Sequence, residues 1–191
     1  MRAIAIEIGI IAEDRSDVET LDVLASRLVR HNQYKVRNFV GRGGGRLKKK
    51  CGAWAKDLCR KGCTALIVAH DLDDACEEEL RRELQSSFVA EDFEESLVLI
   101  PIREIEAWLL ADRHALKDVL STKTLPKVPR NPETIVDPKK EIRKVVKAVG
   151  GNSYINTVHN SLIAANAKVE EIYKRCKSFR PYHDFIQRVV L

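Results

Sequence analysis

The sequence predicts an α/β fold, with a mostly parallel four-stranded sheet flanked by helices and a C-terminal helical extension. Along residues 1–111, runs of nearly uninterrupted apolar residues alternate with amphipathic segments. Such runs are typical of strands covered on both faces, and strands that alternate with helices form parallel sheets through right-handed crossovers. Beyond residue 111 only helical periodicity continues. We therefore expect an α/β core over residues 1–111 and a helical extension packed on it over residues 112–191.

The expected strands are residues 3–12, 34–41, 64–70 and 96–101. The first of these runs begins a chain whose opening apolar stretch carries Arg2 and Glu7. This stretch is too short to span a bilayer and lacks a small-residue cleavage pattern, so it predicts a strand and no export or membrane segment. A chain without such a segment is expected to be cytoplasmic.

Helices are expected between the strands. Residues 17–30 place Val18, Leu21 and Leu24 at helical spacing, after Ser16 as a plausible N-cap. A second apolar stripe begins at Leu47. In the extension, four of the six prolines fall within residues 121–140, which predicts an irregular connection. The helices expected after it are one that carries Ile142 and ends at Gly150, followed by residues 153–176 and 181–190.

Composition limits the function classes. A chain of 191 residues that is 45% hydrophobic can bury one sizeable core, and its formal charge of +5 gives a mild attraction to polyanions. Five cysteines without a Cys-x-x-Cys pair indicate reduced thiols rather than disulfides or a zinc site. Nucleic acid, either DNA or RNA, is therefore a plausible partner, whereas a membrane is not.

Carboxylates follow two of the expected strands. Glu13 ends the first strand, and Asp71 and Asp73 follow the third. Side chains two apart on a strand point the same way, and carboxyl ends of parallel strands share one edge of the sheet, so the three groups are expected to converge there. Their repulsion would be relieved by a hard divalent cation, Mg²⁺ or Mn²⁺. The alternative is that Asp73 or Asp74 simply caps the next helix.

Three further acids extend this pattern. Glu104 and Glu106 follow the fourth strand, where they could complete a second metal position or occupy the first turn of a helix favoured by the macrodipole. Asp17, one turn beyond Glu13, could orient a metal-bound water or merely begin its own helix.

Known acidic α/β sites differ in where their acids lie. A haloacid-dehalogenase phosphatase carries Asp-x-Asp after its first strand, and a response-regulator receiver needs a later lysine-bearing strand that is not found here. At Glu13, Asp71 and Asp73 the chain instead resembles a Toprim domain. More narrowly, it is similar to a family of small bacterial Toprim-like proteins of unassigned function, often encoded beside ATPases and related to the nuclease half of OLD proteins. The motifs that carry this resemblance are "EDRSDVET", "AHDLDDA", "PIREIEAWLLAD", "NPETIVDPKK" and "CKSFRPYHDFIQRVV".

The resemblance implies a metal-dependent nuclease. It implies that Glu13 acts as general acid or base and metal contact, that Asp71 and Asp73 bind Mg²⁺, and that Glu106 or Glu104 completes a second position. It also implies an ATPase partner in anti-phage defence. Asp14 stands where the Toprim pattern has glycine. Alternatively, the chain is a non-catalytic Toprim-like module that has a regulatory role, or that binds nucleic acid or the ATPase.

The stretch "GRGGGRLKKK" joins the second strand to the second helix. Its backbone amides and five basic residues could hold phosphates near a helix N-terminus. These residues are Arg42, Arg46, Lys48, Lys49 and Lys50. No Gly-Lys-Ser/Thr ends the stretch, so it is not a Walker A motif. The alternative is a linker followed by a solvated lysine face.

Other candidates have simpler interpretations. His70 is expected to face away from Asp71 as a packed core histidine. Trp54 and Trp108 fall on apolar stripes and are expected in the core. The basic residues from Lys139 to Lys147 are expected on the solvated face of their helix.

Overall fold

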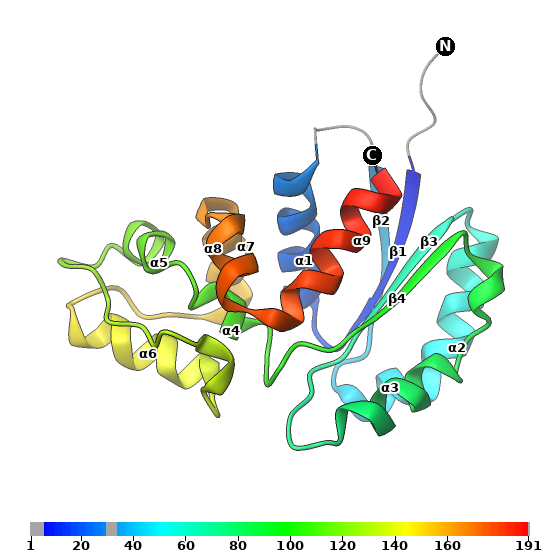
Figure 1. Ribbon diagram of the computed structural model, residues 1–191, viewed down its shortest axis with the longest axis horizontal. Helices are drawn as coiled ribbons and strands as arrows, with labels where there is room; N and C mark the ends of the chain where they lie inside the picture. Colours follow the sequence, from blue (N-terminus) through cyan, green and yellow to red (C-terminus); the bar gives the residue numbers. More distant parts are fainter. Residues whose placement is uncertain (1–5, 30–33, 191) are drawn as a thin grey trace, which may run out of the picture.

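The fold is an α/β sheet with a helical extension, as predicted. The computed structural model describes residues 6–29 and 34–190 (Figure 1). The strands are β1 (Ile6–Ala12), β2 (Tyr34–Val40), β3 (Ala65–Ala69) and β4 (Glu95–Leu99). They pair in the order β2-β1-β3-β4, and all three pairings are parallel. Residues 3–5 of the expected first strand lie outside the described residues.

Helices cover both faces of this sheet (Figure 1). The α-helices are α1 (Arg15–Leu28), α2 (Gly44–Arg60), α3 (Glu77–Gln85), α4 (Glu106–Leu109), α5 (Arg113–Leu120), α6 (Pro138–Ala148), α7 (Asn156–Asn166), α8 (Val169–Arg175) and α9 (Arg180–Val190). Short 3₁₀ helices are η1 (Ala90–Asp92), η2 (Pro132–Thr134) and η3 (Lys177–Phe179). Figure 1 shows α2 and α3 on one side of the sheet and α1 and α9 on the other.

The alternation of side chains along the strands divides the core into two layers. Ile10 packs in the cluster formed with α1 and the extension, whereas its neighbour Ile11 packs in the cluster formed with α2 and α3. Both residues are almost completely buried. The continuous apolar runs in the sequence therefore reflect strands that are covered on both faces.

The helical extension shares the larger of these two clusters. Helix α7 packs against α1, and α9 packs against both α1 and β4. The Tyr182 hydroxyl, on α9, donates a hydrogen bond to the carbonyl of Leu21, on α1. Trp108 is fully buried between them, against Phe179 and Tyr182, as expected of a core residue. The extension is thus continuous with the sheet through one hydrophobic core.

Two further features bear on the sequence-based expectations. Over residues 6–29 and 34–190, none of the helices has the length and apolar character needed to cross a membrane. All five cysteines lie among these residues and all are free thiols.

Candidate functional site

The carboxyl ends of β1 and β3 meet through Glu13 and Asp71. Glu13 directly follows β1, and its Oε1 accepts a hydrogen bond of 3.1 Å from the backbone amide of Asp71. The pairing of β1 with β3, which aligns Ile11 with Val68, brings these two ends together. The expected proximity of Glu13 and Asp71 is therefore confirmed.

Asp17 belongs to the same acidic cluster. It lies in the first turn of α1, where its Oδ2 accepts a hydrogen bond of 3.0 Å from the backbone amide of Asp14. Only 8% of its surface is exposed. Burial and then the charge of Glu106 raise the pKa of Asp17 from its ordinary value of 3.8 to about 7. Asp17 therefore both supports the start of its helix and faces the other acids.

The pKa of Asp71 is raised well above its ordinary value. Burial is the largest cause, followed by the charges of Asp17, Glu106 and Glu13. Like charges enclosed together disfavour ionisation of one another. The cluster formed by Glu13, Asp17, Asp71 and Glu106 is hereafter the acidic cluster.

Glu106 is the most enclosed member. It begins α4 and has no exposed surface. Its Oε1 accepts a hydrogen bond of 2.9 Å from Asn160 and a longer one of 3.5 Å from the Tyr154 hydroxyl, both from the extension. Its Oε2 is buried and has no hydrogen-bond partner among the described residues. Burial raises the pKa of Glu106, and the charge of Glu104 adds to that effect against the opposing influence of Lys139 and Asn160.

Lys139 reaches this cluster from α6. Its Nζ lies 3.0 Å from Glu104 Oε1 and 3.7 Å from Glu106 Oε1, and its backbone amide donates to Glu104 Oε2 at 3.3 Å. Partial burial opposes its charged form, but the carboxylates of Glu106 and Glu104 outweigh it and raise the pKa of Lys139. Of the two glutamates, Glu106 belongs to the acidic cluster, whereas Glu104 makes the shorter contact with Lys139.

The expectation that Lys139 lies on a solvated face is wrong. Asp137 caps α6 by accepting a hydrogen bond of 2.8 Å from the amide of Lys140, and Pro138 occupies the first turn. This start places Lys139 in the first turn beside the exit of β4, where two carboxylates neutralise it. Helical periodicity alone does not reveal such a contact at a helix end.

Asp73 occupies a different position from Asp71. Because β3 ends at Ala69, strand alternation does not extend to Asp73, which lies in a turn with a left-handed φ of 49°. It is exposed, and its backbone carbonyl accepts a hydrogen bond of 2.9 Å from Arg103, which also pairs with Asp74. The prediction that Asp73 or Asp74 caps the next helix is wrong, because the N-cap of α3 is Cys76.

His70 is buried, as expected, but it contacts Glu13. Its Nδ1 lies 3.0 Å from Glu13 Oε1 and 2.7 Å from the carbonyl of Asp71. Its Nε2 is buried without a hydrogen-bond partner among the described residues. A Cβ atom added at Gly44 would lie 2.6 Å from this Nε2 and 3.1 Å from Glu13 Oε2. The glycine at the start of α2 is therefore what lets the helix approach His70 and Glu13.

The predicted basic stretch lies at the same edge of the sheet. The backbone amide of Arg42 donates to the carbonyl of Glu13 at 2.7 Å, and α2 begins inside the glycine run. Arg42, Arg46, Lys49 and Lys50 are exposed, whereas Lys48 pairs with Glu83 at 2.8 Å. The stretch is thus a short turn fixed to Glu13, followed by a helix, rather than a long linker.

The donor set of the acidic cluster suits a hard cation. Carboxylate oxygens are the ligands that Mg²⁺ and Mn²⁺ prefer, and Glu106 Oε2 is a buried oxygen to which no described residue donates a hydrogen bond. Within residues 6–29 and 34–190, no three His, Cys, Asp or Glu side chains are arranged as a ready-made metal site. The residue types fit the cation, and binding would require the carboxylates to draw closer together.

The family of the chain is defined by a match over nearly its whole length. A family model described as a domain of unknown function (DUF4276) matches residues 12–187. The chain belongs to this family. No curated protein and no solved structure matches the chain. The DUF4276 match spans Glu13, Asp71 and Glu106 as well as Lys139 and Asn160, so it includes both the sheet edge and the extension that encloses it.

Sequence reasoning did not identify four contributors to this DUF4276 site. They are His70, Lys139, Tyr154 and Asn160. The only signal for Lys139 was its place directly after the Asp-Pro helix start, within a motif already noted. No feature of the sequence pointed to Tyr154 or Asn160. Their contacts with Glu106 join segments about fifty residues apart, and only the tertiary fold brings these segments together.

Proposed function

We propose that the chain is a nuclease of Toprim type that depends on Mg²⁺ or Mn²⁺ and hydrolyses phosphodiester bonds in DNA or RNA. The observation that carries the proposal is the acidic cluster. Burial and the charges of neighbouring acids, including Glu106, raise the pKa values of Asp17 and Asp71, and Glu106 Oε2 is buried without a hydrogen-bond partner among the described residues. Strongly perturbed carboxyl groups gathered at the carboxyl edge of a parallel sheet are typical of functional sites.

The order of acids along the chain supports the Toprim assignment. The resemblance to Toprim domains rests on Glu13 after the first strand and on Asp71 and Asp73 after the third. The strands β1 and β3 are neighbours in the sheet, which is what the shared site requires. The resemblance also suggests an ATPase partner and a role in anti-phage defence, and the free cysteines suit a cytoplasmic location.

The chain's own groups divide into ligands and positioning groups. Glu13, Asp17, Asp71 and Glu106 would hold the cation, with Asp73 and Glu104 at the rim of the site. When bound, Mg²⁺ or Mn²⁺ supplies Lewis-acid stabilisation of charge on the phosphoryl oxygens. Glu13 would move a proton as general acid or base, and His70 Nδ1 holds its carboxylate in place. The Lys139 ammonium, 3.7 Å from Glu106 Oε1, would add positive charge at the edge of the site.

A non-catalytic role is the second candidate, and Lys139 is the observation that favours it. Its ammonium lies near both Glu104 and Glu106 and therefore compensates part of the acidic charge without a metal. In that case the domain would have a regulatory role, or would bind nucleic acid or an ATPase partner. Its acids would then have a structural role only.

Cleavage of plasmid, single-stranded DNA and tRNA in Mg²⁺ or Mn²⁺ tests the nuclease. Asp71→Asn should lower the rate at least about 100-fold, since removing a main charge-stabilising group costs on that order. Asp118→Asn, which changes an exposed acid on α5, is the matched control and should leave the rate unchanged. Equal cleavage by the Asp71→Asn protein would reject the site. Absence of cleavage with every substrate would favour the binding module.

A further inference from the structure

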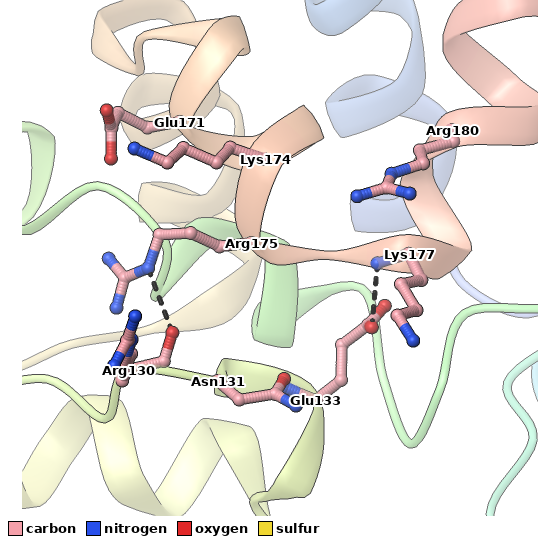
Figure 2. Close-up of a pocket in the computed structure, with 8 residues that line it drawn as sticks. All are labelled: Arg130, Asn131, Glu133, Glu171, Lys174, Arg175, Lys177 and Arg180. Atoms are coloured by element: carbon pink, nitrogen blue, oxygen red, sulfur yellow. Dashed lines mark hydrogen bonds between the residues drawn. The ribbon is translucent and has the colours of Figure 1, made fainter.

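A second pocket lies in the helical extension, outside the acidic cluster. It has a volume of about 570 Å³ and lies between the segment that leads into η2, the end of α8 and the start of α9 (Figure 2). Five of the eight residues that line it are cationic. They are Arg130, Lys174, Arg175, Lys177 and Arg180. Two stretches of chain, one around Arg130 and one over residues 174–180, thus contribute positive charge to one hollow.

Arg175 forms the fixed floor of this basic pocket. Its Nε donates to the carbonyl of Arg130 at 3.2 Å, and its two terminal nitrogens donate to the carbonyls of Ala111 and Pro129. These partners are neutral carbonyl groups, so the guanidinium is held in place while its formal charge is not cancelled by a carboxylate. Figure 2 shows Arg175 above Arg130, with a dashed line from its Nε to that carbonyl.

The two acids of the basic pocket offset only part of its charge, because five cations face two carboxylates. Glu133 is buried and accepts hydrogen bonds from the backbone amides of Lys177 and Ser178, at 2.8 and 2.9 Å, and from the Ser178 hydroxyl. Its oxygens are therefore occupied in fixing the loop that presents Lys177. Glu171 lies one turn before Lys174 on α8.

Three of the cations remain available to a ligand. Arg130, Lys174 and Lys177 are exposed, and within the described part of the chain they form no ion pair with a carboxylate. Arg180 is half-buried, donates to the carbonyl of Tyr173 at 3.1 Å and stacks over the Tyr173 ring at 5.4 Å. A polyanion would contact several cations at once. Because the backbone around these cations is already ordered, binding would cost little conformational entropy.

The loop that carries Lys177 is also tied to the helix that bears Glu106. The Ser178 hydroxyl accepts hydrogen bonds from the Trp108 indole at 2.8 Å and from the backbone amide of Ile102 at 3.3 Å. Trp108 lies on α4, two residues after Glu106, and Ile102 lies in the exit of β4. The basic pocket and the acidic cluster are therefore held to a common element.

We propose that the basic pocket binds phosphate groups of a nucleic-acid strand outside the acidic cluster. The proposal rests on the proposed function, since that strand is the substrate. Guanidinium and ammonium groups are the side chains that recognise phosphate, and several of them in one hollow bind successive phosphates by releasing counterions. The pocket would hold the strand beside the cluster in which it is cleaved.

Binding of labelled single-stranded DNA and RNA in EDTA, followed by fluorescence anisotropy across a series of salt concentrations, tests the proposal. The variant changes Arg130→Gln, Lys174→Gln and Lys177→Gln together. Its matched control changes Lys35→Gln, Lys56→Gln and Arg60→Gln. These are exposed residues on β2 and α2, outside the pocket. The slope of log affinity against log salt should fall by about 2 in the pocket variant, at about 0.7 for each lost contact. Equal slopes for variant and control would overturn the proposal.

A second arm separates a strand from a free phosphate. Thermal denaturation is followed with inorganic phosphate in place of nucleic acid. If phosphate stabilises the unmodified chain but not the pocket variant, while both bind the strands equally, the pocket takes a free phosphate and the proposal fails. Because binding is measured without metal, loss of strand binding in the pocket variant supports the pocket even if the chain cleaves nothing. If the chain cleaves nucleic acid but the pocket variant and its control bind the strands equally, the proposed role of the pocket is rejected while the proposed nuclease function stands.

Discussion

Glu13 accepts a hydrogen bond of 3.1 Å from the backbone amide of Asp71, which joins the exits of two neighbouring parallel strands. The same Glu13 oxygen lies 3.0 Å from the Nδ1 of His70. One oxygen of this carboxylate is therefore held by two groups, while the charges of Asp17, Glu106 and Glu13 add to the burial that raises the pKa of Asp71. The arrangement concentrates negative charge that the fold itself only partly compensates.

Stability in EDTA should rise as the pH falls from about 8 to about 5. Asp17 has a pKa of about 7 in the folded chain against an ordinary value of 3.8, so the folded state binds its proton more tightly than the unfolded state. Ionisation of Asp17 in the folded chain therefore costs stability, which is lost as the pH rises from about 4 to about 7, up to a limit of about 4 kcal/mol at 1.36 kcal/mol for each pKa unit. Thermal denaturation across this pH range measures the effect.

Asp17→Asn is the matched variant for that measurement. Its amide oxygen can still accept the hydrogen bond from the Asp14 amide but carries no charge. At pH 8 without metal it should be more stable than the unmodified chain, and its stability should change less with pH. A variant that is less stable at pH 8 would show that Asp17 is not repelled by its neighbours.

Lys139→Met should destabilise the chain at pH 8 by about 1–3 kcal/mol, less than for a fully buried pair because Lys139 is partly exposed. The loss leaves the buried Glu106 carboxylate without its nearest cation. Lower pH should restore part of the stability, because protonation removes that charge. Urea denaturation at pH 8 and pH 5.5 checks this prediction, with exposed Lys140→Met as the control. Equal losses at both pH values would contradict it.

The fold and half of the site follow from local sequence, whereas the rest depends on tertiary packing. Apolar runs predicted three of the strands and the fourth, β2, was also expected, and because parallel strands end at one edge, Glu13 and Asp71 could be placed together. Asp73 could not be placed, because where β3 ends depends on the turn that follows it. Lys139 was misplaced because its side chain is determined by carboxylates on a distant segment, and such contacts leave no local periodicity.

Gly44→Ala should destabilise the chain, although alanine normally favours a helix over glycine by up to about 1 kcal/mol. The new Cβ would lie 2.6 Å from His70 Nε2 and would displace the ring from Glu13. We expect a net loss of about 1–3 kcal/mol, as for other overpacked sites. Gly45→Ala is the control, since nothing lies within 4 Å of its added Cβ. Urea denaturation compares the two, and an equal or smaller loss for Gly44→Ala would contradict the close approach.

Replacing Arg42 and Arg46 with glutamine should weaken nucleic-acid binding and flatten its salt dependence. Both side chains are exposed at the edge that carries Glu13, and each lost phosphate contact lowers the slope by about 0.7 to 0.9. Filter binding over a range of salt concentrations measures this slope. Lys56→Gln with Arg60→Gln, at the other end of the same helix, should leave it unchanged. An unaltered slope in the Arg42 and Arg46 variant would remove this turn from the binding surface.

Anomalous diffraction from crystals soaked in Mn²⁺ at pH 8 tests the central claim most directly, because it locates the ion without reference to activity. The account predicts an anomalous peak among the carboxylates of Glu13, Asp71 and Glu106, and the loss of that peak in Asp71→Asn. A map without a peak at this position, with Lys139 still beside Glu104 and Glu106, would contradict a metal-dependent site.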